Sequence, residues 1–288
     1  MVPRLTLADG VLMPAIGLGT WPMTNEEAER AVAQAIGLGY RLIDTAYAYG
    51  NEEGVGRGLT AGGIAREDLF VATKLNGEWH GYDAAQRAFE ASAARLGVDY
   101  VDLYLIHWPM PWRDLYLDAW RGLMKLRDDG LVRAIGTSNF KPAHIERLIA
   151  ETGVAPAVNQ IELSPLIPQE QARAFHAAHG IAVQSWSPLG LGAHRQMTLE
   201  SGVAMPRNVL EDPVITDLAR RYDRTPAQIV LRWHVELGAV PIPKSATPTR
   251  LAENLDIFDF ALQPSAIAAI ATIEPGDHRP TDSDAFGH

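Results

Sequence analysis

The sequence contains no cysteine, which excludes disulfide frameworks, thiolate zinc sites and catalytic thiols together. No apolar run approaches the ~20 residues of a transmembrane helix, and the N-terminal stretch MVPRLTLADG lacks the apolar core of a signal peptide. Basic residues are outnumbered, with 25 Lys and Arg against 35 Asp and Glu and a formal net charge of −10. Because such a field repels nucleic acid and anionic membranes, a polyanionic ligand needs a local basic pocket. We therefore expect a cytoplasmic protein with no nucleic-acid or membrane partner.

Two ligand-binding signatures are also missing. The glycine-containing stretches 37–40, 54–58 and 190–194 all lack the third glycine of the Rossmann dinucleotide fingerprint in register. His176 and His179 lie three residues apart on a predicted helix, but no carboxylate follows in a known metal-binding register. We interpret these two histidines as part of a solvated helix face and predict no metal.

The chain is otherwise an ordinary globular one, with 47% hydrophobic and 21% charged residues. Near the N-terminus, Asp9-Gly10 separates two short apolar runs, a pattern that predicts a β-hairpin. Apolar runs rich in β-branched residues then recur and predict eight strands. They are residues 16–21, 41–46, 69–75, 101–107, 133–139, 157–163, 182–189 and 238–244.

Segments with helical periodicity lie between these strands. The first, 24–39, opens with Thr24 and Glu27 in capping-box spacing and ends at Gly37 and Gly39. Five more segments end at glycine in the same way. They are residues 82–97, 117–130, 142–153, 168–180 and 225–238.

This alternation predicts an α/β fold in which a parallel sheet closes into a (β/α)8 TIM barrel rather than an open doubly wound sheet. We find no linker and interpret residues 1–288 as one domain. The stretch 190–212 is too long for a plain connection and is expected to form a flap over the site. Residues 262–276 are expected to add a C-terminal helix, followed by a polar tail.

Functional groups of such a barrel gather at the carboxyl ends of its strands, and several polar or aromatic residues fall there. They are Asp44, Lys74, His107, Ser138 with Asn139, Gln160, Trp186 and Lys244. Each residue alone has an ordinary structural explanation as a cap, a solvated strand end or a core side chain. Together they are harder to explain structurally, because adjacent strand ends bring Asp44, Lys74 and His107 to one part of the rim. The loop after Asp44 returns Tyr49 to the same place.

These four residues suit the reduction of a carbonyl. A phenol has a pKa of about 10, so a tyrosine that donates its proton near neutral pH benefits from a cation such as Lys74. Asp44 would keep that buried lysine charged, and His107 would donate a hydrogen bond to the substrate oxygen. We therefore expect Tyr49 to be the proton donor.

The chain resembles the aldo-keto reductase superfamily along nearly all of its 288 residues. The resemblance is carried by the motifs MPAIGLGTW, LIDTAYAYGNE, ATKL, VDLYLIHWP, GTSNF, NQIELSP, WSPLG and IPKSATPTRLAENLDIFDF. Trp186 in WSPLG, where many relatives have tyrosine, and the short segment after His107 make the chain most similar to the bacterial 2,5-diketo-D-gluconate reductase branch.

The resemblance implies a catalytic tetrad of Asp44, Tyr49, Lys74 and His107, with NADPH as hydride donor and a small aldehyde, ketone or dicarbonyl as substrate. It also implies a monomer. The cofactor-binding residues that it implies are Ser138, Asn139, Gln160, Trp186, Ser187, Leu189, Lys244, Ser245, Arg250, Glu253 and Asn254. Two of these, Lys244 and Arg250, would supply the local cations that a 2'-phosphate needs in an acidic protein.

Aromatic residues after several strands suggest a substrate pocket that excludes water. They are Trp21, Tyr47, Trp79, Trp108 and Trp112, whereas Trp120 and Trp233 lie on predicted helices and are interpreted as core. Two alternatives stay open: a non-catalytic nicotinamide-binding sensor or regulatory subunit on the same fold, and a phosphate-handling barrel hydrolase or isomerase. The retained Tyr49, Lys74 and His107 weigh against the sensor. The stretch 190–195 is only a weak hint of a phosphate loop.

Overall fold

Eight parallel strands form the centre of the computed structural model, which describes residues 2–190, 207–276 and 278–288. In chain order they are β3 (Gly17–Gly19), β4 (Leu42–Asp44), β5 (Phe70–Leu75), β6 (Val101–Ile106), β7 (Val132–Ser138), β8 (Val158–Glu162), β9 (Ala182–Trp186) and β10 (Ala239–Pro241). Each pairs with its neighbour in sequence, in the order β10-β9-β8-β7-β6-β5-β4-β3. A parallel bridge between Gly19 and Lys244 joins the two ends of the sheet, which confirms the predicted barrel.

The predicted hairpin precedes the barrel. Strands β1 (Arg4–Thr6) and β2 (Leu12–Pro14) pair antiparallel, with Arg4 opposite Pro14 and Asp9-Gly10 in the turn between them. Met13 of this hairpin is fully buried and belongs to the same apolar cluster as Leu42 and Phe70, which begin β4 and β5. The hairpin therefore seals the end of the barrel at which the strands start, so that the opposite end is left for the site.

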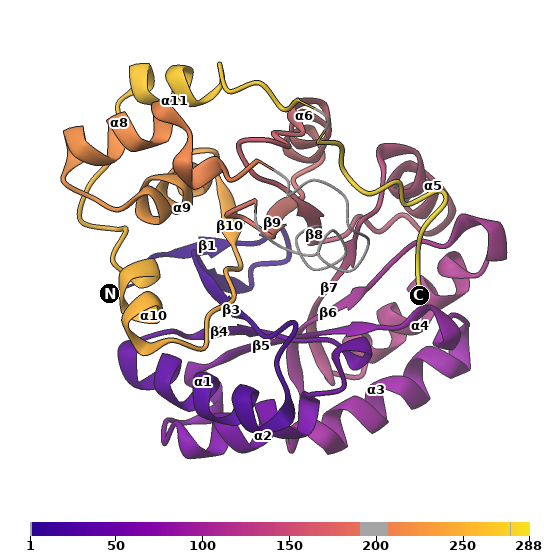
Figure 1. Ribbon diagram of the computed structural model, residues 1–288. Helices are drawn as coiled ribbons and strands as arrows, with labels where there is room; N and C mark the ends of the chain where they lie inside the picture. The colour runs from indigo at the N-terminus through magenta and orange to yellow at the C-terminus, as the bar shows by residue number, and fades with distance from the viewer. Residues whose placement is uncertain (1, 191–206, 277) are drawn as a thin grey trace, which may run out of the picture.

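Helices surround the strands, as Figure 1 shows. They are α1 (Asn25–Leu38), α2 (Glu52–Ala61), α3 (Tyr82–Leu96), α4 (Tyr116–Asp128), α5 (Pro142–Thr152), α6 (Glu170–Ala178), α8 (Pro213–Tyr222), α9 (Pro226–Glu236), α10 (Pro248–Leu255) and α11 (Pro264–Ile270). The six predicted inter-strand helices are all present, and the Thr24–Glu27 capping box forms as expected. Helix α11 lies within the predicted C-terminal segment, and Trp120 and Trp233 are buried in the core.

Helix α2 was not predicted, because its sequence, EEGVGRGLTA, contains three glycines. Glycine is usually unfavourable inside a helix, but these residues let α2 pack closely against its neighbours. A Cβ added to Gly56 would lie 2.5 Å from the carbonyl oxygen of Leu96, closer than side-chain carbons approach backbone oxygens. The glycines here reflect tertiary packing rather than a break in the helix.

Most of the predicted flap, 190–212, lies outside the described residues; its described end forms a short 3-10 turn, Val209–Glu211. Within the described ranges, no helix combines the length and the apolar character needed to cross a membrane. After α11 the described residues, 271–276 and 278–288, contain no further helix or strand, and Figure 1 shows this part of the chain in yellow running past α6 and α5.

Candidate active site at the barrel mouth

A buried lysine links three of the predicted tetrad residues. Lys74, near the end of β5, is fully buried, and its Nζ donates to Asp44 Oδ1 at 2.6 Å and to the Tyr49 hydroxyl at 3.3 Å. It also donates to the backbone carbonyl of Thr45 at 3.0 Å. Strand alignment explains the contact, because β4 and β5 are neighbours and Asp44 pairs with Ala72 two residues before Lys74. The three donor hydrogens of the ammonium group are thereby all used.

The electrostatic balance at this cluster agrees with the prediction for the lysine. Burial lowers the pKa of Lys74, but the neighbouring Asp44 and Tyr49 more than offset it, so the pKa lies above its ordinary value. The result for Tyr49 is different. Burial raises the pKa of the Tyr49 phenol, and Lys74 opposes the rise without reversing it. Lys74 therefore acts in the expected direction, but the phenol stays protonated well beyond neutral pH, the form from which a proton can be donated.

His107 follows β6 directly and faces the same place. Its ring lies 5.7 Å from the Tyr49 ring, centroid to centroid, in an edge-to-face arrangement. The pKa of His107 lies well below its usual value, mainly because the ring is buried and also because the charges of Lys74 and His288 oppose its protonation. The imidazole is therefore neutral near pH 7. Its Nδ1 is buried and has no hydrogen-bond partner among the described residues. A neutral ring next to the phenol can orient a carbonyl oxygen without competing with Tyr49 as an acid.

A second network holds Asp44 from the opposite side. Gln160 Nε2, on β8, donates to Asp44 Oδ2 at 2.8 Å and to Gln184 Oε1 at 2.9 Å, and Gln184 Nε2 contacts Met13 Sδ. Gln184 was not among the predicted site residues, although a glutamine within the apolar run 182–189 was a visible signal. The side-chain amide of Gln160 donates its protons to Asp44 and Gln184. Its side-chain oxygen therefore remains available to accept a hydrogen bond from a ligand.

Asn139 connects the tetrad to Trp186. Its Nδ2 donates to the backbone carbonyl of His107 at 3.1 Å, and its Oδ1 accepts from Trp186 Nε1 at 2.8 Å. Asn139 has a left-handed backbone, φ 63°, which turns its side chain back across the strand ends. The Ser138 hydroxyl donates to the Gln160 carbonyl at 3.0 Å, so Ser138 is also tied to this network. The indole of Trp186 is thus fixed in place while remaining partly exposed.

The predicted phosphate-binding residues lie on the loop after β10 and on α10. Lys244 and Arg250 are both exposed, and neither forms an ion pair with any described residue. Ser245 is buried and its hydroxyl accepts from the Thr247 amide at 3.1 Å. Glu253 accepts from the Thr225 hydroxyl at 2.5 Å, and Asn254 is a buried residue of α10. Unpaired cations next to the start of a helix suit an anionic group.

Ser187 and Leu189, after β9, are partly exposed.

The five aromatic residues predicted for the pocket divide into two groups. Tyr47 and Trp79 meet edge to face at 6.5 Å between centroids, and Trp108 is buried beside His107, with 6.3 Å between their rings. Trp21 and Trp112 are 40% and 52% exposed. Trp108 therefore contacts a predicted tetrad residue, Tyr47 and Trp79 pack on each other, and Trp21 and Trp112 remain exposed.

The prediction for the histidines of α6 was half wrong. His179 is exposed, but His176 is fully buried, and its Nε2 lies 2.9 Å from Asn159 Nδ2. Burial lowers the pKa of His176 to about 4, so it is a neutral core residue rather than part of a solvated face.

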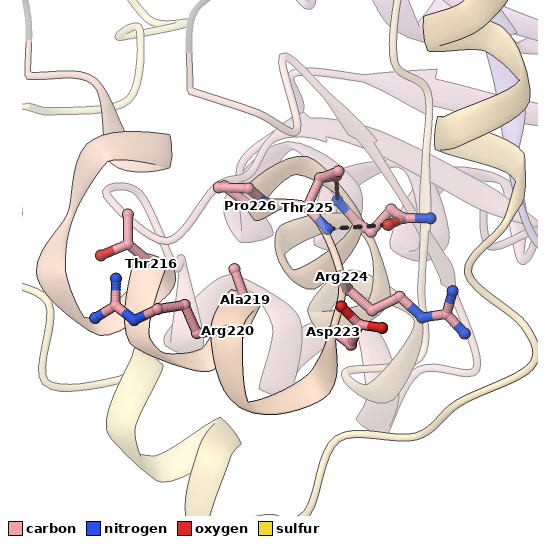
Figure 2. Close-up of a pocket in the computed structure, with 8 residues that line it drawn as sticks. Thr216, Ala219, Arg220, Asp223, Arg224, Thr225 and Pro226 are labelled. Atoms are coloured by element: carbon pink, nitrogen blue, oxygen red, sulfur yellow. Dashed lines mark hydrogen bonds between the residues drawn. The ribbon is translucent and has the colours of Figure 1, made fainter.

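A hollow of about 550 Å³ lies on the outside of the barrel, between α8 and α9 (Figure 2). Its cations are already paired: Arg220 contacts Asp217, and Arg224 contacts Asp256 and Asp259. No residue of the tetrad lines it. The four predicted tetrad residues therefore lie away from this hollow.

Known proteins resemble the chain over its whole length. A model of the Aldo/keto reductase family matches residues 15–275. The methylglyoxal reductase DkgA of Yersinia pestis is 48% identical over 288 residues, 100% of this chain and 98% of the relative. The crystal structure of an aldo/keto reductase from Brucella melitensis has 48% identity and a TM-score of 0.86, covering 94% of this chain and 99% of that one. A Bombyx mori aldo-keto reductase in complex with NADP has 39% identity and a TM-score of 0.88, covering 97% and 94%.

Proposed function

The chain belongs to the aldo/keto reductase family, and from that premise we propose that it uses NADPH to reduce the carbonyl of small aldehydes, ketones or dicarbonyls to an alcohol, with Tyr49 as the proton donor. The observation that carries the proposal is the contact of Lys74 Nζ with both Asp44, at 2.6 Å, and the Tyr49 hydroxyl, at 3.3 Å. The names of the relatives, a methylglyoxal reductase and a reductase solved with NADP, support the same reaction class.

The residues of the mouth fit a nicotinamide cofactor. NADPH, when bound, supplies the hydride. The partly exposed Trp186 indole would provide a flat surface for the nicotinamide ring, and the Gln160 side-chain oxygen could accept from its carboxamide. Lys244 and Arg250, exposed and without an acidic partner among the described residues, would hold the 2'-phosphate against the overall charge of −10.

Each tetrad residue then has one role. His107 donates a hydrogen bond to the carbonyl oxygen and holds it beside the Tyr49 hydroxyl. As the carbonyl carbon gains the hydride, the oxygen takes the phenolic proton, which leaves a tyrosinate beside the Lys74 ammonium. Lys74 stabilises that anion, and Asp44 keeps Lys74 charged throughout. A proton from solvent restores the phenol.

Replacing Tyr49 with phenylalanine tests this assignment. The variant keeps the ring that packs on His107 and removes the proton. We expect kcat for carbonyl reduction to fall about 10²- to 10⁴-fold, the usual contribution of general-acid catalysis. NADPH binding, measured by quenching of tryptophan fluorescence, should change little. A variant that retains most of its kcat would refute the role of Tyr49. A wild-type protein that binds NADPH but reduces no carbonyl would refute the proposed activity.

A further inference from the structure

The last eight residues, 281–288, reach the barrel mouth from the far side of the molecule. Figure 1 shows the chain after α11 in yellow, passing α6 and α5 before it ends near α4. Lys141, at the start of α5, anchors it, with its Nζ 2.6 Å from Asp282 and 2.5 Å from Asp284. Because exposed ion pairs contribute little each, the anchor depends on several contacts together.

Close backbone packing fixes the end of this segment. The Gly77 amide donates to the His288 carbonyl at 2.8 Å. A Cβ added to Gly287 would lie 2.6 Å from Met110 Cγ and 3.1 Å from Trp108 Cβ, so only glycine fits there without movement. The backbone at this end of the segment is therefore held by a hydrogen bond at His288 and by close packing at Gly287.

The side chain of His288 lies against His107, the histidine of the predicted tetrad. The His288 ring lies 4.8 Å from the His107 ring, edge to face, and the Phe286 ring packs on Trp108 at 4.8 Å between centroids. His107 is buried, whereas His288 is exposed, so the outer imidazole can be reached by a ligand that enters the mouth. The hydrogen bonds of the described residues include none made by the His288 ring nitrogens.

We propose that His288 is a substrate-recognition residue that hydrogen-bonds a second oxygen next to the carbonyl held by His107, and so favours vicinal dicarbonyl compounds. The inference rests on the proposed function, since it assigns the first oxygen to His107. Two imidazoles this close together can address oxygens on adjacent carbon atoms. A simple aldehyde offers only one of the two oxygens and leaves His288 unused.

A purely structural explanation is available: His288 could close the mouth as an aromatic plug. The two explanations differ in what phenylalanine would do. Phenylalanine keeps a ring of similar size against His107 but has no hydrogen-bonding atom, so it would preserve a plug and abolish recognition. Asparagine is smaller but can still donate and accept.

The test compares NADPH oxidation with methylglyoxal, a vicinal dicarbonyl, and with propanal, which has the same number of carbons and one carbonyl. We expect His288→Phe to lower the ratio of kcat/KM for methylglyoxal to that for propanal roughly three- to tenfold, the effect of losing one neutral hydrogen bond. The loss should arise mainly in KM for methylglyoxal. His288→Asn should recover part of the ratio. The matched control, His179→Phe, alters an exposed histidine at the end of α6 and should leave the ratio unchanged.

A His288→Phe enzyme with the wild-type ratio would overturn the inference. That outcome includes unchanged values of kcat/KM for both substrates, which a plug preserved by phenylalanine predicts, and an equal loss for both. A second variant, Lys141→Ala, tests the placement without altering the mouth: a loosened segment should lower the same ratio, in the same direction as His288→Phe. Failure of the proposed function looks different, because the wild-type protein would then oxidise NADPH with neither substrate.

Discussion

Replacing Asp44 with asparagine tests whether this carboxylate keeps Lys74 charged. The two side chains are 4% and 0% exposed and lie 2.6 Å apart. Asparagine keeps the shape and can still accept from Gln160, but it removes the charge. Leaving one member of a buried ion pair unpaired costs about 3–5 kcal/mol. Loss of the same interaction removes a cause that raises the pKa of Lys74, so that pKa should fall in the variant.

The pH dependence follows from the direction of each pKa. In the wild type the pKa of Lys74 is raised, so its contribution to stability is present below the unfolded pKa of about 10.4 and is lost as pH rises through the folded pKa. In Asp44→Asn, burial is no longer opposed by Asp44, and the pKa of Lys74 falls below that of the unfolded chain. At pH values between the Lys74 pKa of the folded variant and that of the unfolded chain, the unfolded state binds more protons than the folded state. The free energy of unfolding of the variant should therefore approach that of the wild type as pH rises.

Urea unfolding followed by tryptophan fluorescence, at about pH 6 and about pH 9.5, measures this difference. Asp102→Asn is the matched control. Asp102 is also a buried carboxylate, paired at 2.7 Å and 2.9 Å, but its partners are the guanidinium groups of Arg66 and Arg133, and arginine is always charged in proteins. Its destabilisation should stay constant with pH. If the free energy of unfolding of Asp44→Asn is lower than that of the wild type by the same amount at both pH values, Asp44 does not set the protonation of Lys74.

Two further predictions concern the cofactor and the helix packing. Arg250→Ala should weaken binding of NADPH far more than of NADH, since only the former carries the 2'-phosphate, and equal losses in fluorescence titrations would argue against this pocket. Gly56→Ala should lower the free energy of unfolding by about 1–3 kcal/mol, because the added methyl group would lie 2.5 Å from the Leu96 carbonyl oxygen. Gly37→Ala, in open space on α1, should instead raise the free energy of unfolding by roughly 0.5–1 kcal/mol. A higher urea midpoint for Gly56→Ala than for Gly37→Ala would refute the packing argument.

The barrel was predictable from the sequence because its strands carry a local signal. Runs such as 69–75 and 101–107 are apolar and rich in β-branched residues, and β5 and β6 lie within those limits. The meeting of Asp44 with Lys74 was predictable for the same reason, since consecutive parallel strands place their carboxyl ends side by side.

What could not be predicted depends on neighbours that the local sequence does not specify. The glycines of α2 indicate a loop by propensity, yet Gly56 permits a close approach to Leu96 in α3, far along the chain. His176 has the helical spacing of a surface residue, but it is buried because Asn159 of β8 offers it a partner. In both cases a tertiary contact decides between two locally acceptable structures.

The segment 281–288 is the clearest case, because it has no periodic pattern that could locate it. Its sequence, TDSDAFGH, is polar and predicts only a tail. Its partners come from three separate loops: Lys141 before α5, Gly77 after β5 and Trp108 after β6. Each contact alone is weak, but all three converge on one path, and that path ends at His107. A polar segment can therefore take a defined course to His107 when the surrounding loops, rather than its own propensity, determine its path.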